Sequence, residues 1–251
     1  MGTPLKPNQS QIYYNSQNML ASLKKELKDN INKQQAKNLQ RFFKTGKGEY
    51  GEGDIFMGIK VPIMKGLAKK YISLSFSDIQ KLLKSKYHEE RMIALSILVN
   101  KFNKADEMER KKIYDLYLKN TKYINNWDLV DCTCHKIVGA YLDGKDKKIL
   151  EKLAKSKSIW EKRISIISTF YFINKGSSKE ALKIAEILVN EKHDLIQKAV
   201  GWMLREVGKR CSQEKEEEFL MKYHKTMPRT MLRYSIERFT DKKRQFYMKK
   251  N

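Results

Sequence analysis

A tryptophan and an aspartate four residues apart, Trp127 and Asp131, form the pair best suited to chemistry in this sequence. On an α-helix this spacing places both side chains on one face, one above the other. A carboxylate on a surface that binds nucleic acid repels phosphate, so it lowers affinity unless it performs chemistry. The alternative is structural, with Asp131 paired to a nearby cation such as Arg163, and spacing alone leaves both interpretations open.

The other two tryptophans have cations at helical spacing. Trp160 and Arg163 are three residues apart, and Lys198, Trp202 and Arg205 follow one another at spacings of four and three. Aromatic faces beside cations suit base stacking and phosphate binding. Core packing is the usual role of a single tryptophan, but three beside charged residues favour a functional surface.

Metal and nucleotide sites fit the sequence poorly. Cys132 and Cys134 are two residues apart, so on one helix they point away from each other and cannot close on one ion. The glycine-rich segment Gly46–Gly53 lacks the Gly-Lys-Ser/Thr ending of a phosphate-binding loop, and no H-E-x-x-H pair is present. We therefore expect no metal and no small-molecule cofactor.

The charge balance points to a polyanionic partner. The 251 residues contain 52 Lys and Arg against 29 Asp and Glu, a formal charge of +23. Nucleic acid is the first candidate for such a chain, and a lysine-rich composition inherited from the genome is the alternative. We expect no membrane association, because there is no apolar run of about 18 residues and no basic amphipathic tail.

The N-terminal residues and the cysteines indicate the compartment in which the protein works. Residues 1–6 contain no apolar signal segment, and three cysteines are too few and too uneven for a disulfide framework. We therefore expect a cytoplasmic, nucleoid-associated protein. We also expect it to be a monomer.

Apolar spacing predicts helices along nearly the whole chain, with only 12 Gly and 4 Pro to interrupt them. The predicted ranges are Met19–Leu27, Pro62–Tyr71, His88–Phe102, Asp106–Asn120, Asn126–Tyr141, Lys147–Ala154, Ser158–Phe172, Lys179–Asn190, Asp194–Arg210, Gln213–His224 and Pro228–Phe239. The segment Gly46–Gly53 is expected to be a flexible loop.

A basic residue recurs near the start of alternate helices, at Arg91, Arg163, Lys198 and Arg233. The separations are 72, 35 and 35 residues, and the missing member falls near Trp127. A two-helix unit of this length is typical of helical repeats that stack into a solenoid. The cations at 163, 198 and 233 would then form a ladder along one surface. They could instead only cap or solvate helix starts, and the net charge favours the ladder.

Three segments resemble the AlkD-type DNA alkylation-repair family of helical-repeat DNA glycosylases. They are the W-D-x-x-D element in Asn126–Asp131, the I-W-x-x-R element in Ser158–Arg163, and the most specific, I-Q-K-A-x-G-W-x-L-R-E, in Ile196–Glu206. An upstream F-x-G-I-x-x-P pattern fits Phe56–Pro62, and the resemblance runs from about Gln17 to Phe239.

The resemblance implies excision of cationic alkylpurines, such as N3-methyladenine and N7-methylguanine, from duplex DNA. Asp131 would be the catalytic carboxylate, Trp127 and Trp202 would be aromatic walls at the lesion deoxyribose, and Arg163 would hold the adjacent backbone. The base leaves neutral and the sugar becomes cationic, so one carboxylate can stabilise it and orient water. The family is thought to do this without a pocket for the base, unlike enzymes that flip the base into one.

We therefore predict an all-α fold, a right-handed α-solenoid of HEAT-like two-helix repeats with a concave basic surface. One domain would span residues 1–251, with residues 1–16 as an N-terminal arm and 241–251 as a charged tail. The predicted DNA-binding residues are Arg163, Lys198, Arg205, Lys60, Trp160 and Arg233. Lys60 stands where some members of the family have Gln. The alternatives are a non-catalytic solenoid that binds distorted or branched DNA, and a protein-binding scaffold.

Overall fold

A computed structural model describes the backbone of residues 9–249 and the side chains of residues 19–249. All regular structure in this part of the chain is helical, apart from one isolated parallel bridge between Ile55 and Tyr87. The all-α prediction is thus confirmed. The contacts divide the chain into two compact units, Met1–Glu109 and Arg110–Asn251, which are described separately below.

The first unit is built around one buried helix, α5. Its helices are α1 (Gln9–Asp29), α2 (Lys33–Phe42), α3 (Val61–Lys70), α4 (Phe76–Leu83), α5 (His88–Phe102) and the start of α6 (Glu107–Lys119). Both α3 and α4 pack against α5, which is buried on most sides. Residues 9–16 of the predicted N-terminal arm lie in α1, and residues 1–8 lie outside the described residues.

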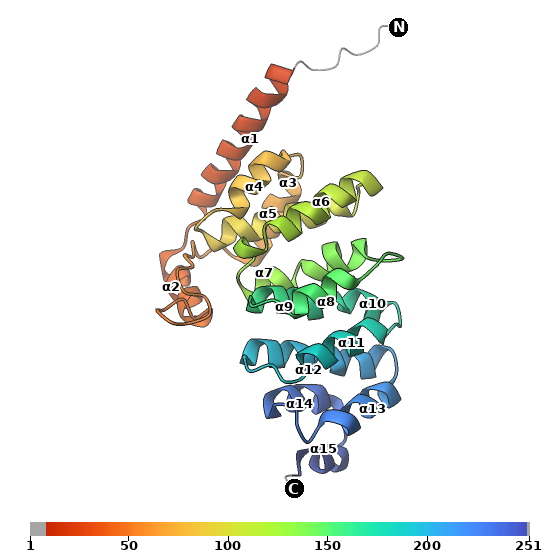
Figure 1. The fold of residues 1–251 in the computed structure, drawn as a ribbon. Coiled ribbons are helices and arrows are strands. Elements are labelled where there is room, and N and C mark those ends of the chain that lie inside the picture. The colour runs from red at the N-terminus through yellow and green to blue at the C-terminus, as the bar shows by residue number, and fades with distance from the viewer. Residues whose placement is uncertain (1–8, 250–251) are drawn as a thin grey trace. The chain divides into compact units, whose positions relative to one another are not determined.

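The second unit consists of stacked helix pairs, as Figure 1 shows. Its elements are η1 (Thr121–Tyr123), α7 (Trp127–Asp131), η2 (His135–Gly139), α8 (Lys148–Ala154), α9 (Ile159–Ser168), α10 (Phe170–Asn174), α11 (Lys179–Leu188), α12 (Asp194–Arg210), α13 (Gln213–Tyr223), α14 (Arg229–Ser235), η3 (Ile236–Arg238) and α15 (Asp241–Met248). Most of the predicted charged tail, residues 241–248, therefore lies in α15.

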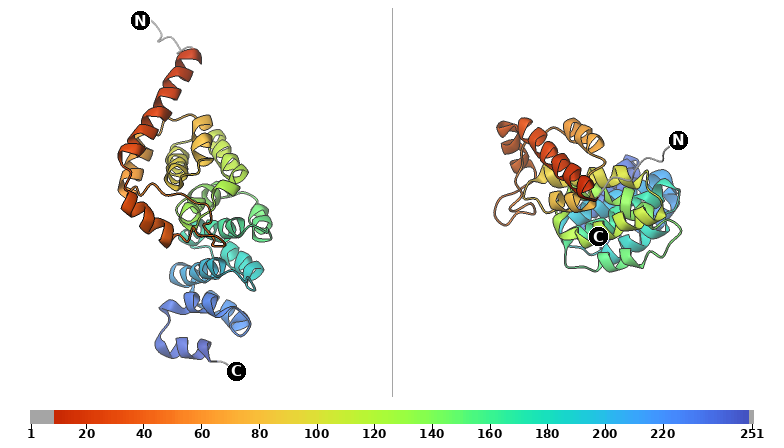
Figure 2. Two further views of the ribbon diagram at one scale, coloured as in Figure 1. Left: turned by 90° about the vertical axis from the view of Figure 1, so that its left-hand side faces the viewer. Right: turned by 90° about the horizontal axis from the view of Figure 1, so that it is seen from above.

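The second helices of these pairs form one row. Helix α9 packs against α7 and α12, and α12 packs against α14, while α8 and α11 contact each other on the other side of the stack. The two layers can be followed in the left view of Figure 2. This arrangement is that of a helical repeat, in which each unit buries its faces against its neighbours.

Glycine permits the closest approach between successive repeats. A Cβ on Gly139 would lie 2.4 Å from the carbonyl oxygen of Ser168, and one on Gly201 would lie 2.4 Å from that of Met231. Real Cβ atoms do not approach backbone this closely, so any side chain would push the helices apart. The same contact, made in two repeats, holds the row of second helices together.

Two predicted helices are interrupted, each at a threonine. The predicted helix Asn126–Tyr141 ends its first segment at Asp131 and resumes as the π-helical turn η2. The Thr133 hydroxyl donates to the carbonyl oxygen of Leu129 at 2.5 Å, which competes with the backbone ladder at this point. The predicted helix Ser158–Phe172 likewise breaks at Thr169, whose hydroxyl donates to Ile166. π-Helical turns are common at functional sites.

Candidate carboxylate site and nucleic-acid interface

The sequence-predicted residues of the second unit lie on its row of second helices. Trp127 and Asp131 are on α7, Trp160 and Arg163 on α9, Lys198, Trp202 and Arg205 on α12, and Arg233 on α14. Segments that are far apart in sequence thus supply adjacent helices of one row. Lys60 belongs to the first unit, where it is exposed and occupies the N-cap position of α3.

Helix α7 holds Asp131 at its C-terminal end. The helix begins at Trp127, whose backbone N–H donates to the side-chain oxygen of the buried Asn126 at 2.8 Å. Leu129 and Val130 are fully buried and fix the orientation of this short helix. Asp131 then projects from its last turn with 15% of its side chain exposed, so its carboxylate is shielded but not closed off.

Arg163 binds both oxygens of that carboxylate. Its Nε donates to Oδ1 of Asp131 at 2.8 Å, and its Nη2 donates to Oδ2 at 2.7 Å. Its Nη1 donates to the backbone carbonyl of Leu195 at 2.5 Å. The planar guanidinium suits this two-pronged contact, and the Arg163 side chain is only 7% exposed. One side chain on α9 therefore ties α7 to the first turn of α12.

Burial and Arg163 act on Asp131 in opposite directions. Burial is the largest effect and raises the pKa of the Asp131 carboxyl above its ordinary value. The charge and hydrogen bonds of Arg163 lower it, and the negative charge of Asp128 raises it further. Arg163 therefore favours the ionised form of a carboxyl group whose ionisation burial opposes. This is the environment of an acidic group held in a partly dry site beside a single cation.

An apolar wall that includes His135 adjoins this pair, and His135 is not among the predicted site residues. His135 lies one helical turn beyond Asp131, and its ring packs edge-on against Phe170, with centroids 5.5 Å apart. Phe170 in turn lies 5.9 Å from the ring of Trp202. Burial lowers the pKa of His135 to about 4, so the ring is neutral at pH 7. Its Nδ1 is buried and has no hydrogen-bond partner among the described residues.

The predicted cationic ladder is mostly neutralised within the unit. Arg163 is bound to Asp131, Lys198 pairs with Asp194 at 2.8 Å, and Arg205 pairs with Glu237. Arg233 is exposed on α14 and forms no ion pair with a described residue. The ladder position at 163 is thus buried, whereas the position at 233 faces solvent.

The three tryptophans are neither core nor fully exposed. Trp127, Trp160 and Trp202 are all half-buried. Each indole therefore presents part of its surface to solvent while the rest packs against the unit. An aromatic face anchored in this way can contact a ligand with little loss of side-chain freedom.

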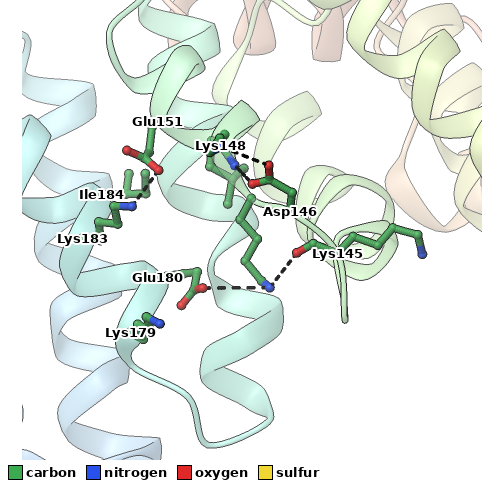
Figure 3. A pocket seen from close by; sticks show the side chains of 10 residues that line it. Lys145, Asp146, Lys148, Glu151, Lys179, Glu180, Lys183 and Ile184 are labelled. Carbon is green, nitrogen blue, oxygen red and sulfur yellow. Dashed lines mark hydrogen bonds and ion pairs between the residues drawn. The ribbon is translucent and has the colours of Figure 1, made fainter.

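A pocket of about 280 Å³ lies elsewhere, between α8 and α11 of the other layer (Figure 3). Its walls are charged, and ion pairs join them: Lys183 binds Glu151 at 2.7 Å, and Lys147 lies 4.0 Å from Glu180. None of the residues predicted for the site lines it. Because the charged side chains of this pocket largely pair with one another, the region around Asp131 is the better candidate for the site.

The described residues contain no cluster of potential metal ligands. Over residues 19–249 there is no group of three or more His, Cys, Asp or Glu side chains that could hold a metal. Cys132 is exposed and Cys134 is buried, and neither forms a disulfide with a described residue. None of the helices described is long and apolar enough to cross a membrane.

Comparisons with known proteins agree with this arrangement. A family model for DNA alkylation repair enzymes matches residues 23–239. Among solved structures, the chain is similar to a predicted DNA alkylation repair enzyme from Enterococcus faecalis, with a TM-score of 0.64 and 16% sequence identity. The alignment covers 84% of this chain and 97% of that chain, and at this identity it shows a shared fold. No curated protein gives a significant match.

Proposed function

The chain belongs to the family of DNA alkylation repair enzymes, and on that basis we propose that it is a DNA glycosylase. Its substrates would be cationic N3- and N7-alkylated purines in duplex DNA, and the bond hydrolysed would be the N-glycosidic bond. The observation that carries this proposal is the paired carboxylate of Asp131. It lies in the row of packed helices that also carries all three tryptophans, and part of it remains open to solvent.

The proposed chemistry needs one carboxylate and no general acid. Alkylation places a positive charge on the base, which then leaves as a neutral molecule and transfers the charge to the sugar. The ionised Asp131 would stabilise this oxocarbenium-like sugar and orient the attacking water. Trp127 and Trp202 would offer electron-rich faces to the same positive charge. No metal or cofactor enters this scheme.

Arg163 has a positioning role in this proposal. Its bonds to both carboxylate oxygens oppose the effect of burial on the pKa of Asp131. Its third bond, to Leu195, fixes the guanidinium against α12. The family resemblance implies instead that Arg163 holds the DNA backbone, and in this geometry its N–H groups are directed at protein acceptors.

We propose that the DNA lies along the row of second helices, on a concave basic surface of a right-handed solenoid. Arg233 and Lys60 are exposed and available to phosphates, and Trp160 offers a half-buried ring. Lys198 and Arg205 would exchange their ion pairs with acidic side chains for phosphate on binding. The protein would act as a monomer on double-stranded DNA.

The ion pair between Asp131 and Arg163 also favours a second function, because Arg163 occupies both oxygens of the carboxylate. A carboxylate whose two oxygens are both bound, and whose pKa burial raises, also suits a purely structural link between repeats. The chain would then be a non-catalytic repeat protein that binds distorted or branched DNA.

Replacement of Asp131 separates the two functions. We expect Asp131→Asn to reduce release of N7-methylguanine from methylated duplex DNA by at least about 100-fold, the typical effect of losing one electrostatic stabiliser. Binding to the same DNA should change little. Asp146→Asn, which removes an exposed carboxylate outside the site, is the matched control and should keep full activity. Equal release by wild type and Asp131→Asn would remove the catalytic assignment, and no release by wild type would favour the non-catalytic function.

A further inference from the structure

Helix α2 carries a stripe of cations without acidic partners. Lys33, Lys37 and Arg41 are spaced by four residues, so they lie along one face of the helix, and all three are exposed. The helix contains no Asp or Glu, and none of the three cations forms an ion pair with a residue that the structure describes. In the second unit, by contrast, Arg163, Lys198 and Arg205 all have acidic partners.

These cations are not explained by the stability of the helix. Lys33 is the first residue of α2, and the first turn contains no acidic residue. A cation at this end opposes the helix dipole, with a typical cost of about 0.3–1 kcal/mol. None of the residues of α2 is fully buried. A short, exposed helix that bears an unfavourable charge therefore points to a partner outside the unit.

The helix is nevertheless held firmly from its other side. A Cβ on Gly58, which has a φ of 81°, would lie 2.1 Å from the carbonyl oxygen of Asn32 and 2.6 Å from the backbone nitrogen of Ala36. The segment that contains Gly58 is held in turn by Glu89. The Glu89 carboxylate accepts hydrogen bonds of 2.8–3.3 Å from the backbone N–H groups of Met57, Gly58 and Ile59. Close packing thus fixes the position of α2, and with it the positions of its cations, before any ligand binds.

The loop that follows α2 keeps its own acids occupied. Glu49 accepts the backbone N–H of Gly46, and Glu52 accepts that of Gly48, each at 2.8 Å. These carboxylates cap turns within the loop, and no ion pair joins them to the described cations of α2. Phe42, the last residue of the helix, is 63% exposed.

We propose that α2 is a second DNA contact, which binds the phosphate backbone through Lys33, Lys37 and Arg41. This inference rests on the proposed function, since it takes duplex DNA as the ligand. The three positions span about 12 Å at 1.5 Å per residue. Phosphates of one strand follow one another about every 3.4 Å along the DNA axis, so a stripe of this length is long enough to face at least three of them.

The test is the salt dependence of binding to undamaged duplex DNA. Each phosphate contact contributes about 0.9 to the slope of log K against log salt, so K33Q/K37Q/R41Q should lower the slope by up to about 2.7. The charge-preserving K33R/K37R/R41K should keep the slope. A control that removes three exposed lysines of α8 and α11, K148Q/K152Q/K179Q, should also keep it.

Failure of this inference and failure of the proposed function give different results. Wild-type binding with an unchanged slope in K33Q/K37Q/R41Q would overturn the role of α2 and leave the glycosylase proposal intact. An equal loss of slope in the control triple variant would also overturn it, because the effect would then be one of net charge. Absence of any wild-type binding to duplex DNA would contradict both proposals.

Discussion

Removal of the Arg163 guanidinium tests the site most directly, and we consider Arg163→Met. The change removes two charge-assisted hydrogen bonds to Asp131 and one to Leu195. It leaves a carboxylate with 15% of its side chain exposed and no cation. Breaking one partner of a buried ion pair costs about 3–5 kcal/mol. We expect a loss of this size at pH 7 in urea unfolding, followed by tryptophan fluorescence.

The effect of Asp131→Asn on stability should differ in sign between the wild type and the Arg163→Met background. In the wild type, Asp131→Asn should destabilise the protein, because it leaves the Arg163 charge unpaired. In the Arg163→Met background the same change should stabilise it, because it removes an unpaired buried carboxylate. Arg233→Met, at the exposed equivalent position two repeats on, is the control and should alter the unfolding free energy by less than about 0.5 kcal/mol.

The pH dependence follows from the same pair. Burial raises the pKa of Asp131, and without Arg163 the pKa should rise further. When the carboxyl pKa is raised in the folded protein, the carboxyl ionises first in the unfolded chain. Arg163→Met should therefore lose stability as the pH rises from the ordinary carboxyl pKa toward the pKa of Asp131 in the folded protein. The slope is at most about 1.4 kcal/mol per pH unit and should vanish in Asp131→Asn/Arg163→Met. A cost of less than about 1 kcal/mol for Arg163→Met, or destabilisation of both backgrounds by Asp131→Asn, would contradict a stabilising ion pair between Arg163 and Asp131.

Two other predictions concern the stability of the second unit. Burial raises the pKa of Glu216 to about 8, so stability should fall as pH rises from about 4.5 to 8, and Glu216→Gln should flatten this dependence in thermal unfolding. An equally steep dependence in that variant would assign the effect to another group. Gly201→Ala should cost about 1–3 kcal/mol in urea unfolding, because its Cβ would lie 2.4 Å from the Met231 carbonyl oxygen. Gly66→Ala, with no atom within 4 Å of the new Cβ, should instead be neutral or stabilising, and equal costs at the two glycines would refute the steric argument.

The row of second helices could be predicted because apolar periodicity and a recurring basic residue are local signals. The helix breaks could not. Thr133 and Thr169 interrupt helices through hydroxyl bonds to backbone carbonyls, and apolar spacing contains no trace of such bonds. Helix α2 was missed for a related reason. Its only aliphatic residues are Ala36 and Leu39, too few to give a periodic pattern.

The candidate site was predictable as a set of residues but not as a set of contacts. Asp131 and Arg163 are 32 residues apart, and the sequence left catalysis and ion pairing as alternatives. Only the packing of α7 on α9 shows that the ion pair forms. The environment of His135 also arises from tertiary packing, because its aromatic neighbour Phe170 comes from another repeat. Burial by distant residues is what sets both pKa values.

The three bonds of Arg163 bear on how this unit would open and close. In a repeat protein, each unit is coupled to its immediate neighbours, and segments can unfold one at a time from the ends. Arg163 connects the helix before its own and the helix after it, so it joins three successive helices of the row in one cooperative block. A ligand that draws Asp131 away from Arg163 would loosen two interfaces at once. The rates of amide hydrogen exchange in α7, α9 and α12 would then change together. Binding at the site would thus alter the stability of the whole centre of the unit.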